Sequence, residues 1–434
     1  MLTVSKYSPL LSIIFLSLVT YANAADKTPA KDINQPPKIK YSKITKPEKE
    51  QDIQENVVSG IPKNQLRDIT PTELGEISQK FVSTLQKKHD DAFYNNLNVE
   101  LIVRNSLAGS IQKLDQLSVE RDNIIRGIVA IPDILTSKIG LRGHIKYLRL
   151  VKRNNGYRGL VRVKFNTGEL SYLEIQAQKD KSGDVKIIDY YDLMLGRSYT
   201  TIVSQMLIKP KQHTLTSDKI LIYTGDQLSF QDSYAQTIRL YQHGEYDKSL
   251  KSLQKLPVKF ISTRDILLLR VQIAKATSRN AYREALVLLE NKFSNDPDLG
   301  LLLSDHYFFT KQYNRALQSI EKFSEYIGGD IALDSLRVKI LINQNQFKAA
   351  IAIGADAIKE DNSYEDIYWL LLKAYLHTYQ YHQVGDTLDV LLDKFNAKFE
   401  IENFYKDPFY REYGFSKQFK KWKEKRVVKT KEKN

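Results

Sequence analysis

One short signature comes back five times in the C-terminal half of the chain, centred on Tyr246, Tyr282, Tyr313, Phe347 and Tyr381. The intervals between these aromatic residues are 36, 31, 34 and 34 residues. Three positions after the aromatic residue stands a small or short one, which is Ser249, Ala285, Ala316, Ala350 or Val384. A period of this length is typical of stacked helical units, because a single unit cannot bury its apolar face alone.

The stretches G-E-Y-D-K-S-L, A-Y-R-E-A-L, K-Q-Y-N-R-A-L, N-Q-F-K-A-A-I and Y-Q-Y-H-Q-V carry the signature. With them the region from Asp232 to Lys394 resembles the tetratricopeptide repeat family. The resemblance implies helix pairs with the aromatic residue at the turn, stacked into an all-α solenoid whose concave face binds another protein. The match is incomplete where a small residue is expected on the first helices, near Thr237, Ile273, Ser304, Val338 and Leu372. An irregular helical bundle is the alternative.

In the family's register, the concave face is formed by the first helix of each pair. The resemblance then assigns partner contact to Tyr234, Tyr241, Arg270, Lys339, Trp369 and Lys373, with Ile238, Asp305, Phe308 and His377 on the same face. Aromatic and cationic side chains in this mixture suit an extended segment that carries acidic and apolar groups. The alternative is that these residues pack between repeats.

The N-terminus has the order of a secretory signal peptide. Lys6 precedes an apolar run from Leu10 to Val19, and Ala22-Asn23-Ala24 follows. The run is about ten residues, which is too short to span a bilayer. We expect cleavage after Ala24 and export to the periplasm or the extracellular space, with an uncleaved membrane anchor as the alternative.

The segments between and after the folded parts differ in composition. Residues 25–65 hold Pro29, Pro36, Pro37, Pro47 and Pro62 among many charged residues, which predicts a disordered linker. Residues 416–434 hold nine Lys or Arg against two Glu, a net charge of +7 out of the chain's +14. Such a tail is either solvated or, in an exported protein, attracted to an anionic envelope surface rather than to nucleic acid.

An α+β domain is expected between these segments. Thr70-Pro71-Thr72-Glu73 has the form of a capping box, and a helix with a buried face follows it. Further helical segments are expected from about Asp90 to Leu107 and from about Val119 to Ile139, the latter interrupted by Pro132. The predicted order of the chain is signal peptide (1–24), linker (25–65), α+β domain (66–210), connector (211–231), about five repeats with a capping segment (232–415) and basic tail (416–434).

Four strand-like runs follow the helices, at Ile145–Arg153, Tyr157–Phe165, Leu170–Gln178 and Val185–Tyr191. Glycine-containing turns between them predict an antiparallel meander. In the second run Val161, Val163 and Phe165 alternate with Arg162 and Lys164, so we expect one solvent-exposed face. Helices followed by such a meander resemble the cone-shaped fold of the nuclear-transport-factor and ketosteroid-isomerase superfamily. The stretches F-V-S-T-L-Q-K-K-H-D-D-A-F and V-K-I-I-D-Y-Y-D look like the usual beginning and end of that fold.

The cone fold hosts enzymes and small-molecule carriers, which makes Asp189 the candidate polar group of a pocket. Asp189 follows Val185 and Ile187 on one strand face with Tyr191 beside it, and His144, Tyr147 and Tyr172 lie on neighbouring strands. Burial would raise the pKa of the Asp189 carboxyl and suit it to act as a base. The alternative is that Asp189 accepts hydrogen bonds from backbone donors near a strand end.

Signals for catalysis are otherwise weak. The chain has no cysteine, no glycine-rich phosphate loop and no metal-binding histidine pair, since His377 and His382 are five residues apart. We therefore expect no cofactor and no metal. The favoured interpretation is an exported, non-enzymatic adaptor that binds a protein or peptide through its repeats, and the alternative is an α+β pocket with Asp189 in it.

Overall fold

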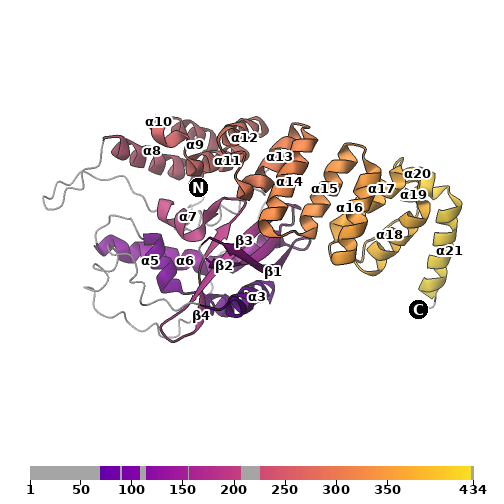
Figure 1. Cartoon of the computed structure of the whole chain (residues 1–434), viewed down its shortest axis with the longest axis horizontal. Helices are drawn as coiled ribbons and strands as arrows, with labels where there is room; N and C mark the ends of the chain where they lie inside the picture. Colours follow the sequence, from indigo (N-terminus) through magenta and orange to yellow (C-terminus); the bar gives the residue numbers. More distant parts are fainter. Residues whose placement is uncertain (1–68, 88–89, 108–113, 155, 207–224, 432–434) are drawn as a thin grey trace, which may run out of the picture. The chain divides into compact units, whose positions relative to one another are not determined.

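The computed structural model describes residues 69–87, 90–107, 114–154, 156–206 and 225–431 (Figure 1). The predicted signal peptide and linker, and much of the predicted connector, lie outside these residues. The chain forms two compact units, the first ending at Ser294 and the second beginning at Asn295. A sheet and its helices lie in the first unit, and from α8 (Gly225–Gln242) onward every regular element described is a helix.

The first described helix, α3 (Pro71–Lys87), begins with the predicted capping box. The backbone N–H of Thr70 donates to Oε2 of Glu73 at 2.8 Å, and the N–H of Glu73 donates to Oγ1 of Thr70 at 3.2 Å. Two of the free N–H groups at the helix start are satisfied in this way. The helix then buries the side chains that recur along one face, which are Leu74, Ile77, Ser78, Phe81, Val82 and Leu85.

Two helical predictions need correction. The segment from Asp90 to Leu107 is two helices, α4 (Asp90–Asn95) and α5 (Val99–Leu107), because residues 96–98 pair with a strand instead. The N–H of Ile187 donates to the carbonyl oxygen of Asn96, and the N–H of Asn98 donates to that of Ile187, both at 2.8 Å. The next helix, α6 (Leu114–Ile139), continues through Pro132 and is not interrupted by it.

The sheet has five antiparallel strands in sequence order, one more than predicted. They are β1 (His144–Arg153), β2 (Gly156–Lys164), β3 (Leu170–Lys179), β4 (Val185–Asp192) and β5 (Arg197–Ser198). The predicted turn glycines Gly156, Gly168 and Gly183 have φ values of 115°, 86° and 93°, a region that side chains with a Cβ avoid. The fifth strand is only two residues long, which is why periodicity did not identify it.

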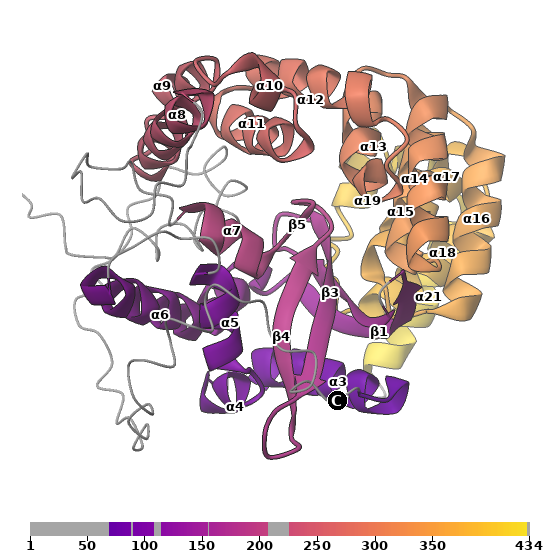
Figure 2. The ribbon, with the colours of Figure 1, turned by 60° about the vertical axis from the view of Figure 1, so that its left-hand side comes forward.

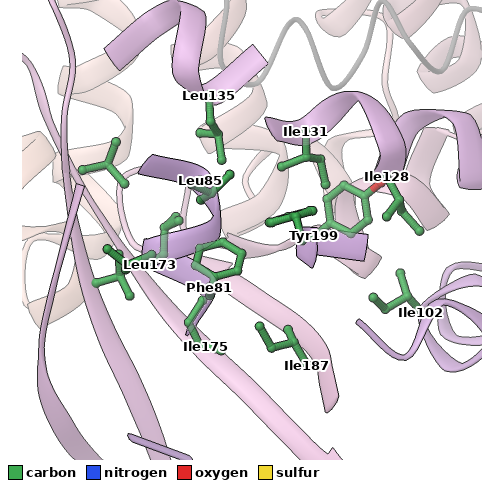
Figure 3. Close-up of a cluster of buried hydrophobic side chains, with 14 of the residues drawn as sticks. Phe81, Leu85, Ile102, Ile128, Ile131, Leu135, Leu173, Ile175, Ile187 and Tyr199 are labelled. Atoms are coloured by element: carbon green, nitrogen blue, oxygen red, sulfur yellow. The ribbon is translucent and has the colours of Figure 1, made fainter. Parts of the chain in front are cut away.

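One face of the sheet forms the core of this region with the helices. Figure 3 shows Phe81 and Leu85 of α3 and Ile131 of α6 beside Ile175 and Ile187 of the sheet, and all of these side chains are buried. Helix α3 runs along the sheet and contacts β1, β2, β3 and β4 (Figure 2). After β5, helix α7 (Tyr199–Met206) packs against β4 and α5.

The polar side of β2 is also buried, which contradicts the expectation of a solvent-exposed face. Arg162 is only 1% exposed and Lys164 is buried as well. In the register of the sheet Arg162 lies between Lys146 on β1 and Tyr172 on β3, and its Nη2 lies 3.1 Å from Nε2 of His144. The alternation of apolar and polar residues in β2 therefore separated the two faces of the strand correctly, but it did not indicate whether the polar face is exposed to solvent.

The first unit continues with two helix pairs, α8 with α9 (Tyr246–Leu253) and α11 (Arg264–Thr277) with α12 (Arg279–Phe293), and the short α10 (Val258–Ile261) between them. Helix α11 also contacts the α+β region. Nη1 of Arg264 donates to the carbonyl oxygen of Gly196 at 2.9 Å, and Nζ of Lys275 lies 3.3 Å from Oε1 of Glu169.

The second unit begins with a short 3₁₀ helix (Pro297–Leu299) and three helix pairs. The pairs are α13 (Gly300–Phe309) with α14 (Tyr313–Ile327), α15 (Ile331–Asn343) with α16 (Phe347–Glu360), and α17 (Glu365–His377) with α18 (Tyr381–Asp393).

The turns inside these pairs share one geometry. Lys311, Asn345 and Tyr379 all have positive φ, at 60°, 58° and 56°. The N–H one residue later donates to a carbonyl five residues back, from Gln312 to Tyr307, from Gln346 to Leu341 and from Gln380 to Tyr375, a left-handed helix end.

The C-terminal residues, predicted as a basic tail, form a helix as far as Lys431. Helix α21 (Lys417–Lys431) follows the short helices α19 (Asn403–Lys406) and α20 (Arg411–Gly414) and packs against α18. Phe419 is 1% exposed and stacks with Trp422 at a centroid distance of 5.7 Å. Within the described part of the chain, no helix combines the length and the apolar character that a membrane span requires.

Candidate functional site

The signature residues lie where helices pack. Tyr246, Tyr313, Phe347 and Tyr381 are the first residues of the second helix in their pairs, and Tyr282 is the exception, as the fourth residue of α12. The small residues Ala285, Ala316 and Ala350 are all at most 2% exposed. These small residues therefore let the helices pack closely against one another.

The second unit presents three of the candidate binding residues on the first helices of its pairs. We call this surface the first-helix face and define it by Phe308 on α13, Lys339 on α15, and Trp369, Lys373 and His377 on α17. Lys339 and Lys373 are 34 residues apart, so they occupy the same position in successive pairs. Both side chains are exposed.

Lys339 and Phe308 join two of the first helices. Nζ of Lys339 lies 5.4 Å from the centroid of the Phe308 ring, which is within the range of a cation–π contact. No carboxylate of the described chain lies within ion-pair distance of Lys339 or Lys373. The two ammonium groups therefore remain available to an acidic group from outside the chain.

On α17 the aromatic side chains form a continuous row with their neighbours. Nε1 of Trp369 donates to Oε1 of Glu365 at 2.8 Å, and its ring lies 5.4 Å from that of Phe399. His377 stacks on Phe347 at 4.5 Å. These contacts fix the rings in place, so a bound segment would meet a preorganised surface.

The candidate binding residues of the first unit have a different environment. Tyr234 and Tyr241 are each 3% exposed and belong to a core cluster with Leu253, Ile266 and Ile273. Burial raises the pKa of the Tyr234 hydroxyl to about 12. The two tyrosines thus pack between helices, which is the alternative that the sequence left open.

Arg270 on α11 is half-buried. Its Nε has no hydrogen-bond acceptor among the described residues, and burial lowers the pKa of its guanidinium. Nε of Arg337 likewise has no acceptor among the described residues, although Nη1 of Arg337 pairs with Asp334. A buried N–H group without an acceptor costs free energy, so an acceptor supplied to Nε of Arg270 would be favourable.

Asp189 is occupied by hydrogen bonds within the fold. Its Oδ2 accepts from Oγ1 of Thr200 at 2.5 Å, and its Oδ1 accepts from the N–H groups of Thr200 at 3.2 Å and Tyr190 at 2.9 Å. Burial raises the pKa of the Asp189 carboxyl, and the bonds from Thr200 oppose that effect. The carboxylate therefore ties β4 to the start of α7, as the backbone-donor alternative predicted.

The cavity beside Asp189 is small. Its volume is about 10 Å³, roughly the space for one water molecule. Apolar side chains such as Phe93 and Ile131 line it with Asp189, Tyr190 and Tyr199, whereas His144, Tyr147 and Tyr172 do not. Small-molecule sites usually exceed about 300 Å³, so this space does not accommodate a substrate of ordinary size.

Metal-binding groups are not assembled in the part of the chain that the structure describes. No cluster of three or more His, Cys, Asp or Glu side chains occurs there. Of the two histidines that are five residues apart, His382 lies on the exposed side of α18, with its Nδ1 3.0 Å from Oδ2 of Asp386.

Two contacts were not predicted from the sequence, those of Arg264 with Gly196 and of Asp389 with Trp422. Each joins residues that are distant in the chain.

Comparison with known proteins adds no family assignment. No family model matches the chain, and no curated protein matches it with significant similarity.

Proposed function

We propose that this protein is an exported, non-enzymatic adaptor that binds a protein or peptide segment through the first helices of its helix pairs. The pairs would stack as a tetratricopeptide-type solenoid, with the first-helix face on its concave side. The observation that carries the proposal is the pair Lys339 and Lys373, which project from equivalent positions of successive pairs with no carboxylate partner in the described chain.

The side chains around these lysines indicate the chemistry of the partner. Phe308, Trp369 and His377 offer ring surfaces, and the lysines offer two cations on neighbouring helices. An extended segment with acidic side chains spaced between apolar ones matches this arrangement.

Peptide selection tests the proposal directly. Peptides are selected from a random library on the intact chain, and their affinity is measured by fluorescence anisotropy. We expect the selected peptides to be rich in acidic and aromatic residues. The double variant Lys339→Ala/Lys373→Ala should weaken binding at least about tenfold, because hot-spot contacts contribute roughly 2 kcal/mol.

A matched control removes the same charge elsewhere in the second unit. Lys322 on α14 and Lys348 on α16 are exposed on second helices. The variant Lys322→Ala/Lys348→Ala should bind the selected peptides as the unmodified chain does. Equal losses in the two double variants would show that the binding is general charge attraction, and the proposal would be abandoned.

A further inference from the structure

The C-terminal helix α21 uses one side to attach to the second unit. Phe419 and Trp422 are buried on this side. Nε1 of Trp422 donates to Oδ1 of Asp389 at 2.7 Å, and Arg426 pairs with Asp389 and Asp393. The acidic groups of α18 are therefore matched to the cations on the attached side of α21.

The opposite side of α21 carries cations that these acids do not reach. Lys417, Lys420 and Lys421 are exposed, and no carboxylate lies within ion-pair distance of them in the described chain. At 100° per residue the three lie on one face, with Glu424 as the acidic residue among them. A helix attached by its aromatic side thus presents a side with three lysines against one glutamate, a net positive charge.

An aromatic edge borders this cationic side. The ring of Phe415 is 69% exposed and lies 5.5 Å from that of Tyr405. Nζ of Lys423 lies 5.9 Å from the centroid of the Tyr405 ring. We call this surface the cap surface and define it by Tyr405, Phe415, Lys417, Lys420, Lys421 and Lys423.

We propose that the cap surface binds the headgroup region of an anionic lipid bilayer. Lysines on an attached helix are attracted to lipid phosphates, and each contributes roughly a fivefold gain in affinity near an anionic surface. An exposed phenylalanine beside them can enter the boundary between headgroups and acyl chains. The three lysines share one side of a single helix and can therefore face a planar anionic surface together, which is why we favour the bilayer over an acidic protein.

Vesicle sedimentation of the full chain tests this proposal. The chain should sediment with vesicles of phosphatidylethanolamine and phosphatidylglycerol, should not sediment with phosphatidylcholine vesicles, and should be released by high salt. The variant Lys417→Glu/Lys420→Glu/Lys421→Glu should bind at least about a hundredfold more weakly. Phe415→Ser should also weaken binding, because it removes the apolar contact.

Matched control variants distinguish an effect of the cap surface from an effect of net charge and from an effect of any exposed apolar side chain. Lys292, Lys322 and Lys348 are exposed lysines on other helices, and Leu141 is a fully exposed apolar residue of the first unit. Lys292→Glu/Lys322→Glu/Lys348→Glu and Leu141→Ser should leave vesicle binding within about threefold of the unmodified chain.

Two results would overturn the proposal. One is equal loss of vesicle binding in the cap-surface and control variants. The other is binding of the intact chain to soluble polyglutamate but not to anionic vesicles, which would indicate an acidic protein as the partner. The cap-surface variants should still bind the peptides selected for the first-helix face, so failure of either proposal leaves the other intact.

Discussion

Nη1 of Arg264 donates a hydrogen bond to the carbonyl oxygen of Gly196 at 2.9 Å. Arg264 begins α11, and Gly196 lies in the turn between β4 and β5, so this bond joins a helix pair to the sheet within the first unit. Gly196 has φ of 63°, and a Cβ atom placed there would lie 2.7 Å from Cδ1 of Leu268. Glycine is favoured here both by the left-handed backbone conformation and by the close packing.

Replacing Gly196 by alanine should therefore destabilise the protein by about 2–4 kcal/mol, from the strained backbone and the overpacked contact with buried Leu268. Urea unfolding measures the change. Gly183→Ala is the control, because Gly183 has φ of 93° but no atom within 4 Å of the added Cβ. The control should lose only about 1 kcal/mol, and an equal loss in both variants would remove the packing part of the explanation.

The turn residue Lys311 should be improved by glycine. Its φ of 60° strains a residue with a Cβ, so Lys311→Gly should stabilise the second unit by about 0.5–1 kcal/mol after the entropy of the unfolded glycine is subtracted. Thermal unfolding provides the measurement. Lys322→Gly, at an exposed position inside α14, should instead destabilise by about 1 kcal/mol. A loss of stability in the Lys311 variant would contradict this reading of the turn.

Asp192 should make stability depend on pH in the acid range. Its Oδ1 accepts bonds from Oγ of Ser171 at 2.8 Å and from the N–H groups of Met194 at 2.9 Å and Leu195 at 3.1 Å. Burial nevertheless raises the pKa of the Asp192 carboxyl from 3.8 to about 6. Because the folded pKa is the higher one, the contribution to stability is complete below pH 3.8 and is lost as pH rises through 6.

The variant Asp192→Asn keeps the accepting oxygen and cannot ionise. Between pH 3.8 and 6.5 the free energy of unfolding of the natural chain should fall relative to the variant by up to about 3 kcal/mol. Urea unfolding at a series of pH values measures this difference, which cancels groups that titrate in both proteins. Parallel curves for the two proteins over this range would show that Asp192 does not carry the effect.

Phe419 and Phe415 are four residues apart, and we expect truncation of Phe419 to destabilise the protein strongly and truncation of Phe415 to have little effect on stability. Phe419 is 1% exposed in the aromatic cluster with Phe404, Tyr413 and Trp422, so Phe419→Ala should cost about 3–5 kcal/mol and remove the hydrogen-exchange protection of α21. Phe415→Ala, at an exposed ring, should change stability by less than about 0.5 kcal/mol. Retained protection of α21 in the Phe419 variant would contradict attachment through this cluster.

Features that depend on near neighbours in the chain could be predicted from the sequence. The capping box of Thr70 and Glu73 and the turn glycines Gly168 and Gly183 formed at the predicted residues, and the helix-to-helix turns lie next to Tyr313 and Phe347 as expected. Their causes act over a few residues, through a side chain that reaches a free N–H, a backbone angle or a helical period.

The environment of polar side chains was decided by the tertiary structure. The sequence predicted a solvent-exposed face for Arg162 and a binding surface, or packing between repeats, for Tyr234, and both residues are buried. It left open whether Asp189 lines a pocket or accepts from backbone donors, and only the structure identifies Thr200 as its partner. These outcomes depend on which distant elements pack together, and local periodicity carries no information about that. For the same reason the uncompensated lysines of the first-helix face and of α21 could be recognised only once their surroundings were known.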